Sequence, residues 1–325
     1  MRFHKNGIKY FFRFILQIPS IYRSSNKAHI FLFATRRSGS TLLRNMIYSQ
    51  PGFNYIDQPL DVLHFNPYIK CLPCTELNQY ICLNESEHTK IRKYLDKLLS
   101  REFIIRSQWQ LFNKNYHWTW DRYVLKILTA NAEIEWFNCA YKNKIKIVYL
   151  TRHPIPAALS AVNLNWGLTV AAYLNNEKFI RKYLSKDCLD IALNIMRNGT
   201  ELEKFVLNWC LENLVPLRNW KSNNWMTTVS YERIVSDPRY SVQRICQSLG
   251  LDDPDRMIEM VMKPSRTSTK ISRKRILSNE PLKIISAWRK LVNASDLESV
   301  DRILKEFRLH LYSAHDLFPD ENFDK

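Results

Sequence analysis

The sequence predicts an α/β fold, chiefly because two stretches of chain each show the pattern of a strand, a polar loop and a helix. Residues 30–33 are an unbroken apolar run, typical of a strand buried on both faces, and residues 145–150 also predict a strand. With 325 residues, 46% of them hydrophobic, the chain can bury a large core. We therefore expect one globular domain over residues 26–325, preceded by a basic amphipathic segment at residues 1–25.

The loop that follows the first predicted strand has the composition of an anion site. Gly39 lets the backbone approach a ligand closely, and a helix is expected over residues 41–49. Hydroxyl groups lie beside the unpaired amides at the start of that helix, those of Ser38, Ser40 and Thr41. Such a helix start favours negative charge. The same residues also fit an ordinary capped helix with solvated arginines.

The spacing of this loop can be compared with the nucleotide-binding P-loop, G-x-x-x-x-G-K-[ST]. Ala34 takes the position of the first glycine and Ser40 that of the lysine, while the second glycine and the final threonine are kept. Cationic charge is carried instead by Arg36 and Arg37, on the other side of the turn. The loop therefore predicts a phosphate-like ligand without the usual features of an ATPase.

A second candidate anion site follows the strand predicted at residues 145–150. Arg152 comes at the end of that strand, and Ser160 lies eight residues after Arg152. Two prolines between them open the next helix. Arginine is a forked, permanently charged partner for phosphate, to which a serine hydroxyl can add. In open α/β sheets ligands lie outside the carboxyl ends of strands, so two such sites predict a ligand with two separated anionic groups. Taken alone, the position of Arg152 is also compatible with an ion pair to a surface carboxylate.

Together these stretches resemble the sulfotransferases that use 3′-phosphoadenosine 5′-phosphosulfate (PAPS). In that family a loop of the form [KR]-S-G-[ST]-[ST] holds the 5′-phosphosulfate, and an Arg and a Ser eight residues apart hold the 3′-phosphate. The matching residues are 37–41, with Arg36 beside them, and Arg152 with Ser160. The R-S-G-[ST]-[ST] form is most similar to the carbohydrate and tyrosylprotein branches. The resemblance implies a P-loop-like three-layer fold, a central parallel sheet flanked by helices, over about residues 28–315.

Two further stretches match parts of that family's nucleotide site. Tyr231 follows a predicted strand in TTVSYERIVSDP, and the resemblance places it near the adenine; without the resemblance it simply opens a capped helix. Residues 262–274 are basic and rich in Ser and Thr, and they match the flexible loop that closes over the nucleotide. The candidate contacts in that loop are Ser265, Arg266 and Ser268.

Sulfuryl transfer requires an in-line approach, stabilisation of the charge on the equatorial oxygens and removal of the acceptor proton. It needs no metal. Arg37 and the backbone amides of residues 39–41 would neutralise the bridging and leaving oxygens. Lys126, in the apolar run YVLKIL, matches a lysine that contacts the sulfuryl group in the tyrosylprotein branch. The resemblance makes it a transition-state clamp, although a strand-end lysine also fits a solvated charge.

The resemblance leaves the proton acceptor open. Asp57 lies twenty residues after Arg37, where the tyrosylprotein branch has a Glu. The Glu of the carbohydrate branch precedes a proline, and that position is here Gln58, which cannot take a proton. We expect Asp57 to be the base, with His64 as its substitute. The alternatives are Asp61, an impaired enzyme, or a structural role for Asp57 as a helix cap.

The formal charge of +17, from 48 basic and 31 acidic side chains, favours anionic partners. The basic residues are dispersed and no nucleic-acid recognition motif is present, so we expect no nucleic acid as partner. We expect the acceptor to be a hydroxyl of a carbohydrate or glycolipid, with specificity set by helical insertions at residues 71–122 and 163–222. One alternative is a P-loop kinase or NTPase, which would need an acidic magnesium ligand where YLTRHP has an arginine. The other is a non-catalytic basic binding protein.

The N-terminal segment carries a short apolar, aromatic patch at residues 7–17. It is too short to span a bilayer and lacks the features of a cleaved signal peptide. It fits either peripheral contact with an anionic membrane or a first helix packed on the domain. Seven cysteines with a single C-x-x-C fit free thiols in a reducing cytoplasm, which is the expected location. A truncated enzyme of the Golgi lumen would have the same features.

Overall fold

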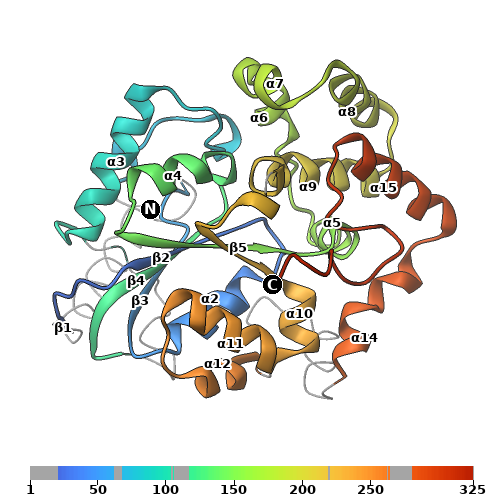
Figure 1. Cartoon of the computed structure of the whole chain (residues 1–325). Helices are drawn as coiled ribbons and strands as arrows, with labels where there is room; N and C mark the ends of the chain where they lie inside the picture. Colours follow the sequence, from blue (N-terminus) through green and yellow to red (C-terminus); the bar gives the residue numbers. More distant parts are fainter. Residues whose placement is uncertain are drawn as a thin grey trace, which may run out of the picture.

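A computed structural model describes residues 21–61, 68–103, 105, 117–218, 220–261, 263 and 280–324. Within them a parallel sheet is covered by helices on both faces, which is the α/β fold that the sequence predicts (Figure 1). Several predicted residues lie outside this description, namely residues 7–17, His64, Ser265, Arg266 and Ser268. None of the described helices is both long and apolar enough to cross a bilayer.

Six strands form the sheet in the described part of the chain, and every pairing is parallel. They are β1 (Ile21–Tyr22), β2 (His29–Ala34), β3 (Gly52–Asp57), β4 (Thr119–Ile127), β5 (Ile145–Thr151) and β6 (Met226–Ser230). Their order is β3–β4–β2–β5–β6, and β1 pairs with the start of β4. The two strands predicted from apolar runs, β2 and β5, are therefore neighbours at the centre. Because all strands are parallel, the loops that follow them meet at one edge of the sheet.

The central strand β2 is buried on both faces, as its unbroken apolar sequence predicts. Phe31 and Phe33 belong to one hydrophobic core, and Ile30 and Leu32 belong to another. All four side chains are inaccessible to solvent. A strand with period-two alternation between two cores is the central layer of a three-layer fold.

Helices cover the two faces of this sheet (Figure 1). The larger core contains residues of α3 (Glu85–Leu99), α4 (Ile134–Ala140), α5 (Pro154–Val162), α6 (Val170–Leu174), α7 (Glu177–Tyr183), α8 (Lys186–Asn198), α9 (Glu201–Arg218) and α15 (Ala294–Glu306). The opposite core contains residues of α2 (Ser40–Tyr48), α10 (Tyr231–Ser236), α11 (Pro238–Leu249) and α12 (Pro254–Val261). The remaining helices are α14 (Pro281–Ile285) and the 3₁₀ turns η1 (Ile69–Cys71), η2 (Glu76–Asn78), η3 (Asn131–Glu133), η4 (Trp220–Ser222) and η5 (Ala287–Leu291).

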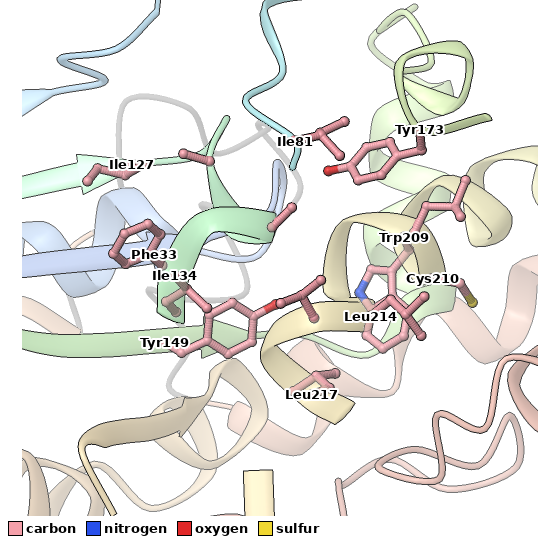
Figure 2. Packing of buried hydrophobic residues seen from close by; sticks show 14 of the residues in the cluster. Phe33, Ile81, Ile127, Ile134, Tyr149, Tyr173, Trp209, Cys210, Leu214 and Leu217 are labelled. Atoms are coloured by element: carbon pink, nitrogen blue, oxygen red, sulfur yellow. The ribbon is translucent and has the colours of Figure 1, made fainter. Parts of the chain in front are cut away.

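Helix α9 links the larger core to the edge of the sheet. Figure 2 shows Trp209 of α9 and Tyr149 of β5 in the same core. The hydroxyl of Tyr149 donates to the side-chain carbonyl of Asn213, and the indole Nε1 of Trp209 donates to the backbone carbonyl of Arg152 at 3.0 Å. The backbone at the end of β5 is therefore fixed by a buried helix.

Candidate functional site

The carboxyl ends of β2, β5 and β6 bring together residues that the sequence keeps far apart. Gly39, the N-cap of α2, has a left-handed φ of 94°, and a Cβ there would lie 2.5 Å from Cδ2 of Tyr231. Only glycine fits this position, because both the backbone conformation and the tyrosine ring exclude a side chain. The guanidinium of Arg152 lies 4.5 Å from the centroid of the same ring. The loop after β2 is thus in contact with the residues that follow β5 and β6.

Arg37 joins the two candidate anion sites into one cluster. Its Nε donates to the Ser160 hydroxyl oxygen at 2.9 Å, and its backbone carbonyl accepts from Nη1 of Arg152 at 3.0 Å. Arg37 also has a left-handed φ of 65°, which non-glycine residues seldom adopt. Sequence spacing predicted two separate anion sites, and the structure shows that their side chains touch. We call residues 35–41, Arg152, Ser160 and Tyr231 the donor cluster.

The cationic groups of the donor cluster are not paired with carboxylates among the described residues. Within the described part of the chain, Arg36, Arg37 and Arg152 form no ion pair, and the buried Nε of Arg152 has no hydrogen-bond partner. Burial, followed by the nearby charge of Arg152, lowers the pKa of Arg37. No side chain caps the N-terminus of α2. This arrangement fits a ligand with anionic groups, such as the two phosphate-bearing ends of PAPS.

The hydroxyl-bearing residues of the loop differ in their contacts. Ser38 is fully buried, and its hydroxyl donates to the carbonyl of Thr35 at 2.7 Å. The Ser38 hydroxyl proton is therefore engaged within the loop, where this hydrogen bond stabilises the turn. Ser40 is buried and Thr41 is half-buried in the first turn of α2. Of the three, Thr41 has the most surface to offer a ligand.

An aromatic residue that the sequence analysis did not single out lies beside the donor cluster. The guanidinium of Arg36 is 5.3 Å from the centroid of Trp166, and that of Arg37 is 6.0 Å away. Trp166 is 37% exposed, in the segment between α5 and α6. Thr169 anchors that segment by donating to the buried carboxylate of Glu212 at 2.8 Å. Nothing in the local sequence indicates that Trp166 lies beside the donor cluster, because its position depends on where α5 ends.

The ends of β3 and β4 carry a second cluster of charged side chains. The strand register pairs Asp57 with Lys126. One carboxylate oxygen of Asp57 lies 2.8 Å from Nζ of Lys126, and the other lies 2.8 Å from Nη1 of Arg44. The side chains of Lys126 and Arg44 are 6% and 8% exposed, whereas that of Asp57 is 28% exposed. The expected clamp and the expected base are therefore in direct contact, and we call the three residues the carboxylate cluster.

Burial lowers the pKa of Lys126; the carboxylate of Asp57 opposes this effect and the charge of Arg44 adds to it. The sequence analysis missed Arg44. Arg44 lies outside the apolar stripe predicted for this helix, so the sequence offered no reason to expect its burial. Its partner could not be named before the strand register was known.

The alternatives for the proton acceptor lie in other surroundings. Gln58 adopts a left-handed φ of 50° in a turn, and its backbone N–H donates to the backbone carbonyl of Lys126 at 2.8 Å. Asp61 is buried and accepts from the side-chain amide of Asn78 at 2.7 Å. Of the two aspartates considered, Asp57 alone keeps exposed surface. No group of three or more His, Cys, Asp or Glu residues in the described ranges is placed to hold a metal ion.

Two buried titratable groups lie behind Arg152. The carboxylate of Glu232 accepts from the backbone amide of His153 at 3.0 Å and from the Tyr312 hydroxyl at 2.9 Å. Burial raises the pKa of Glu232 to about 7, against the opposing charge of Arg152. Burial also lowers the pKa of His153 to about 3. A carboxyl group with a pKa near 7 is only partly ionised at neutral pH, so it leaves much of the Arg152 charge in place.

The chain matches a protein-family model. The family model described as "Sulfotransferase family" matches residues 29–255, well over half of the chain. The matched range contains every residue of the donor cluster and of the carboxylate cluster. No curated protein matches the chain.

Among solved structures, the chain is similar to mouse sulfotransferase SULT7A1 complexed with PAP, at 16% identity over 88% of this chain and 85% of that one, with a TM-score of 0.39. It is also similar to the sulfotransferase domain of the Synechococcus PCC 7002 olefin synthase, at 16% identity over 88% and 96% of the two chains, with a TM-score of 0.43. A third structure is retinol dehydratase in complex with androsterone and inactive cofactor PAP, at 15% identity over 86% and 80%, with a TM-score of 0.38. These TM-scores are too low to indicate an acceptor or the place of a ligand.

Proposed function

The chain belongs to the sulfotransferase family and is a PAPS-dependent sulfotransferase, and we propose that its acceptor is a hydroxyl of a carbohydrate or glycolipid. The observation that carries this proposal is the exposed indole of Trp166 beside the guanidinium of Arg36. An indole face offers a flat apolar surface for a sugar ring, and a guanidinium binds an acidic substituent. The net charge of +17 favours such an acidic acceptor.

For the donor, we propose that Arg37 and the amides of residues 39–41 hold the 5′-phosphosulfate, with Arg152 and Ser160 on the 3′-phosphate. PAPS supplies an activated sulfuryl group when it is bound. Ser160 accepts the bond from Arg37 through its oxygen, so its hydroxyl proton can be donated to a phosphate. Tyr231 offers its ring to the adenine, from its place against the glycine of the loop.

For the chemical step, we propose that Asp57 takes the proton of the acceptor hydroxyl on its partly exposed carboxylate. Lys126 orients that carboxylate through the ion pair of 2.8 Å and supplies positive charge toward the reacting group. Arg44 holds the second oxygen from α2, the helix that the donor loop opens. The loop and the proton acceptor are thus tied together by one short helix.

The donor assignment is tested by thermal stability with 3′,5′-adenosine bisphosphate (PAP), ADP and ATP at equal concentrations, with and without Mg²⁺. A ligand at one hundred times its Kd adds about 2.7 kcal/mol, which raises the Tm of a protein of this size by a few degrees. We expect PAP alone to stabilise the protein. Stabilisation only by ATP with Mg²⁺ would favour a kinase instead.

The acceptor assignment is tested with Trp166→Ala in assays against glycans, glycolipids, phenols and tyrosine peptides. Loss of a ring that stacks on the acceptor should raise the acceptor KM about tenfold. The Kd for PAP should change less, because the ring contacts Arg36 and Arg37 only through their guanidinium groups. The matched control is Trp118→Ala. It removes a 63% exposed tryptophan that directly precedes β4, at the edge of the sheet opposite the donor cluster. Transfer to phenols or peptides in preference to glycans would refute the carbohydrate acceptor.

A further inference from the structure

A segment of chain that follows α15 crosses the ends of β5 and β6. The Thr228 hydroxyl of β6 donates to the carbonyl of Phe323, and the aromatic ring of Phe323 lies 5.1 Å from that of Trp220. Further along, the carboxylate of Asp324 accepts from the backbone amide of Ser230 at 2.8 Å and from its hydroxyl at 2.5 Å. Residues 311–324, which we call the crossing segment, are therefore bonded to the last residues of β6.

Asp324 is a buried carboxylate with several partners. Its side chain is 5% exposed, and it lies 3.1 Å from Nε of Arg233 and 3.5 Å from Nη2 of Arg244. Arg244 also donates to the backbone carbonyl of Thr228. Removal of this carboxylate would leave two partly buried guanidinium groups without their counter-charge and the Ser230 amide without its acceptor. The end of β6 is therefore held in place by a residue 94 positions away in sequence.

Ser230 connects this anchor to the donor cluster. Ser230 is the N-cap of α10, and the first residue of that helix is Tyr231. The ring of Tyr231 fills the space over Gly39 and lies under the guanidinium of Arg152. Because the Tyr231 ring leaves no room for even a methyl group at Gly39, a small shift of Ser230 would displace the ring, the loop or both.

The crossing segment also contacts the residues next to Arg152, on the β5 side of the donor cluster. The Tyr312 hydroxyl donates to Glu232 at 2.9 Å, and Glu232 accepts from the amide of His153, the residue next to Arg152. The His153 ring has its Nε2 at 3.1 Å from the carbonyl of Ser313. The same segment therefore fixes the backbone after β5 and the backbone after β6.

We propose that Asp324 is a positioning residue of the donor site, which sets Tyr231 and Arg152 for the nucleotide through Ser230. This inference rests on the proposed donor site. Asp324 touches neither the loop nor a group that we assign to the reaction, and its effect is carried by the backbone of β6 and α10. Its loss therefore acts on donor binding, whereas the proposed proton acceptor lies at the ends of β3 and β4 and the proposed acceptor contact is Trp166.

The test compares Asp324→Ala and Asp324→Asn with the unaltered chain in PAP titrations by calorimetry and in donor kinetics, well below the Tm of each protein. Loss of several hydrogen bonds to a charged group at the anchor should raise the Kd for PAP and the donor KM about tenfold in Asp324→Ala. Asp324→Asn keeps an oxygen for the Ser230 amide, so its Kd for PAP and its donor KM should lie between those of the unaltered chain and those of Asp324→Ala. The acceptor KM and the kcat at saturating donor should change less than about threefold.

Two controls separate positioning from stability. Leu98→Ala empties a fully buried site in α3 and should lower the Tm at least as much while the Kd for PAP stays within about twofold. Glu321→Ala removes an exposed carboxylate from the crossing segment and should change neither quantity. If Asp324→Ala does not fold, Ser230→Ala keeps the backbone amide bond to Asp324, removes the hydroxyl bond to Asp324 and the N-cap bond from the Arg233 amide, and should still weaken PAP binding.

A lowered Tm in Asp324→Ala together with an unchanged Kd and donor KM would show that Asp324 is only structural. Asp324 would also be only structural if Leu98→Ala weakened PAP binding to the same degree. Failure of the unaltered chain to bind PAP is a different outcome. It would overturn the donor site itself, and the positioning role with it.

Discussion

Two clusters of cationic side chains share the carboxyl edge of the sheet, and they differ in what neutralises them. In the carboxylate cluster, Asp57 lies between Lys126 and Arg44 with both contacts at 2.8 Å. In the donor cluster, Arg37 and Arg152 contact a hydroxyl, an aromatic ring and a carbonyl, and no described carboxylate pairs with them. In the first arrangement each cation already has a carboxylate oxygen as partner, although a net charge of about +1 remains, whereas the cations of the second have no described carboxylate partner and fit an anionic ligand. We infer that the donor cluster binds the nucleotide and that the carboxylate cluster takes the acceptor proton. A substitution in one cluster should therefore impair its own function and leave the other unchanged.

The strongest test of this separation is Asp57→Asn. If Asp57 is the base, kcat should fall by roughly 10²- to 10⁴-fold, because the amide cannot take a proton. The Kd for PAP should stay within about twofold, since no donor contact is lost. Kinetics at saturating donor and calorimetry with PAP measure the two effects.

The matched control is Asp121→Asn, which removes a carboxylate near the opposite end of β4 that pairs with Lys27 at 3.5 Å. It should leave both kcat and the Kd for PAP unchanged. Normal turnover in Asp57→Asn would place the base elsewhere. A parallel loss of PAP affinity would show that the two clusters act as one.

The state of Glu232 behind the donor cluster can be read from the pH dependence of stability. The folded protein keeps the Glu232 proton up to a pKa of about 7, whereas the unfolded chain releases it near 4.5. Between these values the folded state binds more protons, so the stabilising contribution is complete below pH 4.5 and is lost as pH rises through 7. The difference in unfolding free energy between the unaltered chain and Glu232→Gln should therefore fall by about 3 kcal/mol over that range.

Urea denaturation of both proteins at several pH values from 4 to 8 measures this difference. His153, whose folded pKa of about 3 has the opposite effect, is common to both proteins and cancels. Parallel curves would mean that the pKa of Glu232 is the same in the folded and unfolded states, so that its carboxylate is ionised at neutral pH. In that case the donor cluster would be partly neutralised and the contrast between the clusters would weaken.

Arg152→Ala should weaken PAP binding with little effect on kcat at saturating donor. Hydrogen bonds to a charged group contribute about 1.5–3 kcal/mol, which corresponds to a roughly 10- to 150-fold higher Kd. Arg197→Ala, which removes an exposed arginine from α8, is the control for the change in net charge. Equal loss of affinity in the two variants would mean that only net charge matters.

The smallest expected effect belongs to Ser160→Ala. It removes the oxygen that accepts from Nε of Arg37 and the hydroxyl proposed for the phosphate. One such bond contributes about 0.5–1.5 kcal/mol, so the Kd for PAP should rise roughly two- to tenfold. Ser100→Ala, at an exposed position after α3, should have no effect. A change in acceptor KM with an unchanged Kd would assign Ser160 to the acceptor side.

Much of the fold and of the donor cluster could be predicted from local sequence. The apolar runs that become β2 and β5, and the glycine whose φ of 94° opens α2, are marked by residues next to one another. The parallel arrangement then brings the residues after these strands to one edge. This is why Arg37, Arg152 and Ser160 could be named together, whereas Tyr231 was assigned by the family resemblance. Their roles in binding remain proposals that the variants above test.

The residues that the sequence did not reveal share a different feature. Arg44, Trp166 and Asp324 each act through a partner far away in the chain, and nothing in their own neighbourhood names that partner. A buried arginine signals that a counter-charge exists, but the strand register decides which one. An aspartate near the end of the sequence has the composition of an ordinary polar tail until the crossing segment is placed over β6.

The sequence by itself determined the α/β class, the loop that approaches an anion and the cationic residues that follow the strands, because these depend on periodicity and turn chemistry over a few residues. Only the tertiary structure decided which cations are neutralised. Pairing of β3 with β4 places Asp57 against Lys126, and the crossing segment places Asp324 against Ser230. Charge interactions act through space and strengthen where water is excluded, so their outcome depends on packing that no short stretch of sequence contains.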